Sequence, residues 1–135
     1  RERRRQGARR RLQSTRLLAG HAADALDLQR RQPGERIQAA FPEAKVVKTL
    51  NTVNNQVMTE PGRLPGAHNV FVCGEDEEAK AAVSELLQGF GWPRESIVDL
   101  GGISAARGTE MYLPLWLHLM GSLGTADFNI QLRVP

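Results

Sequence analysis

The sequence lacks several features that would define its chemistry at once. No G-x-G-x-x-G motif occurs in its 135 residues, so it has no loop of the kind that binds pyrophosphate at a helix N-terminus. The single cysteine, Cys73, excludes an internal disulfide and predicts a reducing compartment, the cytoplasm. The most apolar stretch, residues 111–123, is shorter than the roughly 20 residues that span a bilayer. The three histidines have no His or Cys partners at metal-ligand spacing, so no metal site is predicted.

Charge divides the chain into two parts. Residues 1–34 hold ten arginines against three acidic residues, a balance of +7, whereas residues 35–135 hold eight basic and twelve acidic residues, a balance of −4. Pro33 and Gly34 punctuate the chain where the composition changes. We therefore predict an arginine-rich head at 1–34, disordered or irregularly helical, and a folded domain at 35–135.

From residue 35 onward the pattern alternates between strand and helix. Apolar and β-branched runs predict strands at 45–50, 69–73 and 97–100, and an edge strand at 128–134. Helical spacing predicts a short helix ending before Pro42, a second from the Asp76 cap to Gln88, and a third over 104–120 that Pro114 kinks or divides. This order favours an α/β fold with a mostly parallel sheet and helices on its faces.

Three segments carry a family resemblance: KVVKTLNTVNNQVM, NVFVCGEDEEAKAAVSELLQGFGW and VDLGGISAARGTEMYLPLWLHLMGSLG. Together they resemble the C-terminal half of the NADP oxidoreductase, coenzyme F-420-dependent family, and they are similar to the cytosolic domain of the six-transmembrane ferric reductases. The resemblance implies part of a Rossmann-like, doubly wound domain. It also implies an oxidoreductase that positions NADP(H) beside a deazaflavin or flavin for direct hydride transfer, without an acid–base dyad.

The candidate site residues lie where two predicted strands end. Ligands of open α/β sheets bind beyond the carboxyl ends of the strands, and Asn51, Thr52 and Val53 follow the first strand. The resemblance implies that these three face the nicotinamide, whereas the residues alone also fit an ordinary polar turn. Gly101 and Gly102 follow a later strand, and either a close approach to the cofactor or a tight turn explains them.

Other conspicuous residues have simpler interpretations. Cys73 is predicted to be a small buried apolar residue. Arg107 and Glu110, three apart on a helix, predict an ion pair. An apolar helical face is predicted to be core, and the resemblance implies that the same helix packs against a second subunit in a homodimer. That face consists of Met111, Tyr112, Leu115, Trp116, Leu119 and Met120.

The head leaves three interpretations open: a nucleic-acid-binding tail, a solvated extension, or translation from another reading frame. The chain begins at Arg1 rather than at methionine, which also fits a truncated or processed start. The leading hypothesis is the C-terminal part of an NADP(H)-dependent oxidoreductase, weak or inactive by itself. The alternative is a non-enzymatic module that binds polyanions such as RNA through the head.

Overall fold

The computed structural model describes residues 32–135, so nearly all of the arginine-rich head, and with it the polyanion-binding hypothesis, lies outside the described residues. The described part contains a three-stranded sheet in the order β1 (Val47–Thr49), β2 (Val70–Gly74) and β3 (Ile97–Asp99). Helices pack on the sheet, which confirms the predicted α/β class.

The sheet is mixed. β2 and β3 are parallel, as expected, and α4 (Glu77–Gly89) connects them. β1 runs antiparallel to β2, with Val47 opposite Gly74 and Thr49 opposite Val72, which differs from the mostly parallel sheet that we predicted. The connection from β1 to β2 holds only the short helices α3 (Asn55–Thr59) and η1 (Pro61–Arg63). Neither is long enough to return along the sheet, as a parallel crossover requires, so the chain reverses at one end.

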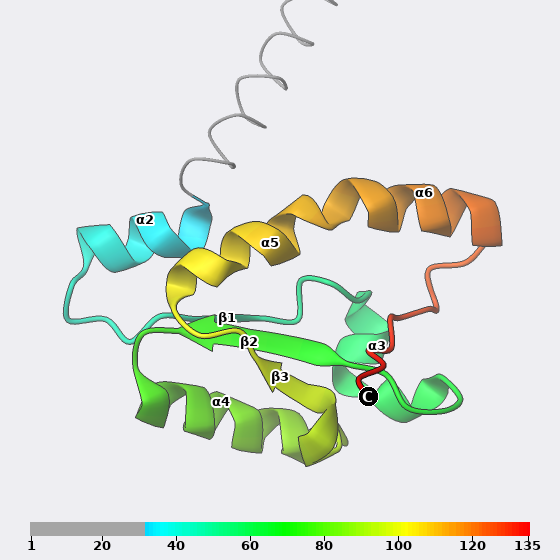
Figure 1. Cartoon of the computed structure of the whole chain (residues 1–135), viewed down its shortest axis with the longest axis horizontal. Coiled ribbons are helices and arrows are strands. Elements are labelled where there is room, and N and C mark those ends of the chain that lie inside the picture. The colour runs from blue at the N-terminus through cyan, green and yellow to red at the C-terminus, as the bar shows by residue number, and fades with distance from the viewer. Residues whose placement is uncertain (1–31) are drawn as a thin grey trace, which may run out of the picture.

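The helices form two layers (Figure 1). α4 lies on one face of the sheet, and α2 (Pro33–Ala40), α5 (Ala106–Met111) and α6 (Leu113–Leu123) lie on the other. Short 3-10 turns, η2 (Arg94–Ser96) and η3 (Ile103–Ala105), flank β3. Pro114 divides the long helix, as predicted. The edge strand predicted at 128–134 is wrong, because residues 124–135 form no strand.

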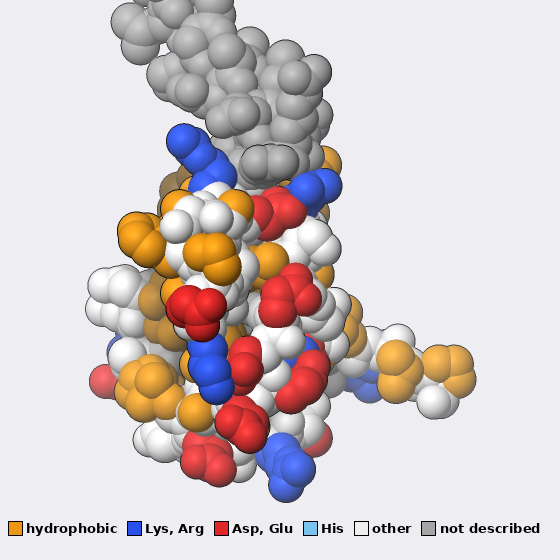
Figure 2. Space-filling view, turned by 90° about the vertical axis from the view of Figure 1, so that its left-hand side faces the viewer, with side chains coloured by type: hydrophobic (Ala, Val, Ile, Leu, Met, Phe, Trp, Pro, Cys, Tyr) orange, Lys and Arg blue, Asp and Glu red, His pale blue; other side chains and the backbone are white. Residues whose placement is uncertain are grey.

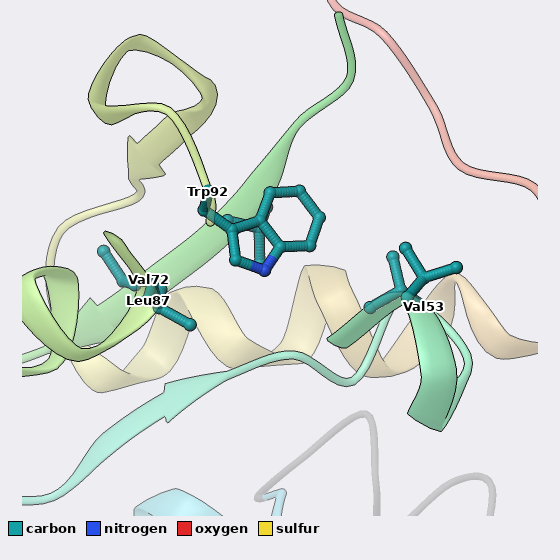
Figure 3. Packing of buried hydrophobic residues seen from close by; sticks show 6 residues of the cluster. Val53, Val72, Leu87 and Trp92 are labelled. Carbon is teal, nitrogen blue, oxygen red and sulfur yellow. The ribbon is translucent and has the colours of Figure 1, made fainter. Parts of the chain in front are cut away.

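The core lies between α4, β2 and the end of β1 (Figure 3). Trp92 is 1% exposed and lies between Val53 and the pair Val72 and Leu87. Its Nε1 donates a hydrogen bond of 2.9 Å to the carbonyl oxygen of Met58, so this buried indole is fully satisfied. The apolar side of α4 is only partly buried, because Leu87 is inside while Leu86 is 56% exposed.

The face of α5 and α6 that we predicted as core is only partly buried, with Tyr112, Trp116, Leu119 and Met120 at intermediate exposure. Met111 and Leu115 are 57% and 56% exposed, and no residue of α6 is buried. The physical reason is that α6 continues past the end of the strands, as Figure 1 shows, so the sheet does not cover its far part; there Trp116 stacks on Phe128 at a centroid distance of 5.3 Å. The expected contact of this helix with a second subunit stays a prediction.

Residues at the predicted boundary open helix α2. The side-chain oxygen of Gln32 caps the helix by accepting a 2.8 Å hydrogen bond from the Gly34 amide. The backbone amide of Gln32 in turn donates to the carboxylate of Glu35. Glu35 then accepts two hydrogen bonds from Arg107, of 2.8 and 2.6 Å, which attach α2 to α5. The predicted Arg107–Glu110 pair is therefore wrong, since Glu110 instead pairs with Lys48 of β1. An ion pair between two residues of the same helix contributes little stability, so Arg107 and Glu110 each pair with a residue from another element instead.

Candidate functional site

The chain leaves β1 through a strained residue. Leu50 has a φ of 67°, and it is the only non-glycine with a positive φ among residues 32–135. A branched side chain pays a steric cost in this left-handed region, and such outliers persist where the surroundings impose them, often at functional sites. The turn presents Asn51, which is partly exposed and makes no side-chain hydrogen bond within the described part of the chain.

Next to Asn51, the structure buries polar groups that have no partner. Thr52 is 3% exposed, and its Oγ1 has no hydrogen-bond partner within residues 32–135. In the described residues, three other buried side-chain atoms share this state: Tyr112 OH, Trp116 Nε1 and Asn129 Oδ1. An unsatisfied buried polar group costs about 1–3 kcal/mol, so such atoms mark places where a further partner would be stabilising.

Thr52 and Tyr112 line one pocket of about 270 Å³. Its other walls come from β2, from the turn after β3, from α5 and from the segment that follows α6, through Phe71, Leu100, Gly108, Thr109 and Ile130. Burial raises the pKa of the Tyr112 hydroxyl, so it stays protonated and able to donate near neutral pH. The pocket is thus mainly apolar; of the three lining residues that carry a hydroxyl, Thr109 donates to Ala106 O, whereas Thr52 and Tyr112 have no partner among the described residues.

Val53, the third predicted residue at this end, faces the protein interior. It is 5% exposed and belongs to the Trp92 cluster, as Figure 3 shows. Its neighbour Asn54 caps α3 by accepting a 2.8 Å hydrogen bond from the Val57 amide. Val53 therefore supports the turn from within, which leaves Asn51 and Thr52 as the two predicted residues with polar side chains at this end of the sheet.

Gly101 and Gly102 lie at the opposite end of the sheet, because β1 is antiparallel to β3. Gly101 has a φ of 90°, its amide donates 2.8 Å to Asp99 Oδ1, and its carbonyl accepts from the Gly74 amide at 2.9 Å. A Cβ on Gly102 would lie 2.8 Å from Oε1 of Glu75. That same oxygen accepts from the Ile103 amide at 3.0 Å, so the turn is satisfied within the protein.

The strand-to-helix turn between β2 and α4 is acidic. Asp76 caps α4 through a 2.8 Å hydrogen bond from the Ala79 amide, and Glu77 and Glu78 follow in the first turn. This amide bond is the main reason that the pKa of Asp76 is lowered. Figure 2 looks onto this end of the molecule and shows acidic side chains gathered over it. Carboxylates occupy the position at which a helix N-terminus would otherwise bind phosphate.

Residues away from the pocket have structural surroundings. Cys73 is 1% exposed, as predicted, and burial is the main cause of its raised pKa, which disfavours a reactive thiolate. Across residues 32–135, no three His, Cys, Asp or Glu side chains are grouped to hold a metal ion. In the same range, no helix has both the length and the apolar character needed to cross a bilayer.

Sequence patterns do not point to Leu50 in the turn, nor to several residues that line the neighbouring pocket. Leu50 gave no signal, because its φ depends on the turn that tertiary packing imposes. Tyr112 is the only tyrosine of the chain, and this rarity was a usable hint. Phe71 and Ile130 were assigned to strands, and only the fold brings them beside Thr52.

Comparisons with known proteins bear on the family resemblance of the chain. No family model matches the chain. The F420-dependent NADP reductase of Methanocaldococcus jannaschii is 32% identical over 85 residues, which are 63% of this chain and 37% of that protein. A solved structure from Arthrobacter sp. FB24, assigned as an F420-dependent NADP-reductase, has 54% identity and a TM-score of 0.71. It covers 75% of this chain and 45% of its own. The predicted resemblance is confirmed.

A further relative is a metalloreductase, which agrees with the predicted similarity to the ferric reductases. The metalloreductase STEAP3 of Rattus norvegicus is 33% identical over 94 residues, which are 66% of this chain and 18% of that protein. The chain thus resembles the C-terminal half of the NADP oxidoreductase, coenzyme F-420-dependent family. It spans less than half the length of each of these relatives, at 18%, 37% and 45%.

Proposed function

We propose that this chain forms one wall of the active site of an NADP(H)-dependent oxidoreductase, at which hydride passes between NADP(H) and a deazaflavin or flavin. The observation that carries the proposal is the end of β1, where a strained Leu50 precedes a partly exposed Asn51 and a buried Thr52 whose hydroxyl has no partner. The names of the two reductases that the chain resembles supply the reaction class.

The residues present fit the ring end of a dinucleotide. An amide side chain such as Asn51 offers both a donor and an acceptor, which is what a carboxamide requires. The apolar pocket beside Thr52 keeps water away from a flat ring, and the hydroxyl groups of Thr52 and Tyr112 offer donors near it. When bound, NADPH supplies the hydride. The protein's own residues orient the ring and exclude water, so they need no acid or nucleophile.

The described residues do not fit the phosphate groups of a dinucleotide. The only strand–helix–strand unit with parallel strands in the described part is β2–α4–β3, and Asp76, Glu77 and Glu78 line the start of its helix. Those carboxylates repel phosphate instead of binding it. We therefore derive no pyrophosphate contact from this chain, and we expect the ring end alone to contribute to affinity.

The test compares two ligands by calorimetry on the full 135-residue chain, in about 150 mM salt to screen the arginines of the head. We expect reduced nicotinamide mononucleotide and NADPH to bind with similar, weak affinities, because the larger ligand gains nothing from its adenosine part. NADPH binding that is tight and saturable would contradict the account of the phosphate end. Absence of binding by both ligands would contradict the proposed wall.

Substitutions of two asparagines test whether Asn51 itself contributes to ligand binding. Asn51→Ala should weaken binding of the mononucleotide by about fivefold, the equivalent of one neutral hydrogen bond of about 1 kcal/mol. Asn55→Ala changes an exposed asparagine on α3 and should leave binding unchanged. Equal effects of the two substitutions would show that Asn51 has no particular role.

A further inference from the structure

The segment after α6 is fastened across the site by side chains from the β1–β2 connection. Residues 126–132, here named the strap, are held at one end by Asn54, whose Nδ2 donates to Ala126 O at 2.7 Å and to Asp127 Oδ1 at 2.8 Å. Arg63 adds an ion pair of 3.3 Å to Asp127. The strap carries Ile130, a wall of the 270 Å³ pocket, so its position determines how closed that pocket is.

The other end of the strap depends on Asn129. Its Nδ2 donates to the carbonyl of Asn69 at 2.8 Å and lies 2.9 Å from Nδ1 of His68. Two further bonds accompany these contacts: the backbone amide of Asn69 donates to Ile130 O at 3.0 Å, and the backbone amide of Leu132 donates to the side-chain Oδ1 of Asn69 at 2.8 Å. Among the described residues, Asn129 Oδ1 is buried without a hydrogen-bond partner, so the side chain of Asn129 makes its hydrogen bonds through Nδ2 alone.

The chemistry of the two neighbours fixes the tautomer of His68. Its Nε2 lies 2.9 Å from the carbonyl oxygen of Pro61, which only accepts, so Nε2 carries the hydrogen. Its Nδ1 then presents a lone pair, which accepts from the Nδ2 donor of Asn129. With the Asn129 amide in this orientation, both ring nitrogens are satisfied only when the imidazole is neutral. The ring of Trp92 packs against the imidazole in an edge-to-face arrangement, with the centroids 5.0 Å apart.

We propose that His68 is a pH-sensitive fastener of the strap. Protonation puts a second N–H on Nδ1, directly against the Nδ2 donor of Asn129. Rotating the Asn129 amide would relieve that contact, but its Oδ1 would then face the Asn69 carbonyl and the 2.8 Å bond would be lost. In either arrangement the strap loses at least one hydrogen bond. Acidification therefore loosens the strap and withdraws Ile130 from the pocket.

The charged groups around His68 are carboxylates and one arginine. Glu95 of η2 lines the same hollow as His68, and Glu60 with Arg63 flanks Pro61. On the strap, hydrogen bonds from Asn54 first and Arg63 second lower the pKa of Asp127, so this carboxylate stays charged. Ordinary carboxylates also titrate below pH 5, whereas histidine changes charge between pH 5 and 8.

The experiment follows the strap by NMR on the full chain between pH 7.5 and 5.5. Amide exchange of Leu132 and Asn69, corrected for the intrinsic effect of pH, reports the two strap bonds, and methyl dynamics of Ile130 report the pocket wall. Loss of one such bond should accelerate corrected exchange by about tenfold at the acid end. A strap whose corrected exchange does not change with pH would overturn the proposal.

Three variants separate a proton switch from a structural role. His68→Gln keeps one donor and one acceptor but cannot titrate, so the strap should stay fastened at both pH values. Asn129→Asp gives the imidazolium an acceptor, so acid should tighten the strap instead of loosening it. His118→Gln changes an exposed histidine of α6 and should keep the wild-type profile. Acid loosening that persists in His68→Gln would refute the role of His68, and Asn129→Asp tests it independently if that variant folds poorly.

Discussion

The two ends of the sheet, both predicted to face a cofactor, differ in how completely their polar groups are satisfied. At the Gly101–Gly102 end, the turn is closed by the carboxylates of Asp99 and Glu75, which accept from backbone amides, and by the Gly74 amide, which donates to the Gly101 carbonyl. At the β1 end, Leu50 is strained and the Thr52 and Tyr112 hydroxyls have no partner. A satisfied turn is explained by folding alone, whereas unsatisfied groups in a strained turn call for a ligand or another chain.

The satisfied end also contains the most buried charge of the described residues. Lys80 is 4% exposed, and its Nζ donates to both carboxylate oxygens of Asp99 at 3.0 and 2.8 Å. Burial raises the pKa of Asp99, but the hydrogen bonds from Lys80 and the Gly101 amide together bring it below its ordinary value. Thus one aspartate joins the helix α4 to the glycine turn, and this end of the sheet has the bonding of a structural joint.

The largest expected effect is a loss of stability on substitution of Gly101 in the turn after β3. Gly101→Ala forces a side chain into a φ of 90° where nothing lies within 4 Å, so backbone strain alone should lower the free energy of unfolding by about 1–2 kcal/mol. Gly62→Ala, which also has open space but no positive φ, should be neutral or slightly stabilising. Urea unfolding of both variants gives the answer. Loss of ligand binding with unchanged stability in Gly101→Ala would reverse the comparison of the two ends.

A pair of threonines tests the difference in hydrogen bonding. Thr52→Val removes a buried hydroxyl without a partner and should raise the free energy of unfolding by about 1 kcal/mol. Thr49→Val removes a hydroxyl that donates to Phe71 O at 2.6 Å and should lower it by about the same amount. Thermal or denaturant unfolding distinguishes the signs. If both substitutions destabilise, Thr52 is satisfied in solution and the two ends do not differ.

The smallest expected effect is alkaline. The folded-state pKa of Tyr112 is raised by burial, so the unfolded chain ionises first as the pH climbs past about 10. The associated stability is complete below that pH and decreases as the pH rises toward the folded value. Tyr112→Phe should remove this loss. Because Tyr112 is the only tyrosine, absorbance of the native protein follows it directly, and ionisation at or below pH 10 would show that the hydroxyl is solvated.

Local pattern predicted the helices and most strands because those depend on neighbours in sequence. The Asp76 cap, the division at Pro114 and the strand before Gly74 all follow from residues within a few positions. The failures involve distant partners. Arg107 binds Glu35 instead of Glu110, and residues near 128–134 form a side-chain-fastened strap instead of a strand.

The amino-acid sequence is enough to predict the alternation of strands and helices, the family likeness, the charge division and the turn at residues 51–53. Its periodicity and end signals are local, and they survive in any arrangement that buries the apolar residues. Only the tertiary structure decided that β1 runs antiparallel to β2, which carries Asn51 and Thr52 to one end of the sheet and Gly101 and Gly102 to the other. Strand direction depends on how a connection packs in space, and no residue pattern within the strand records it.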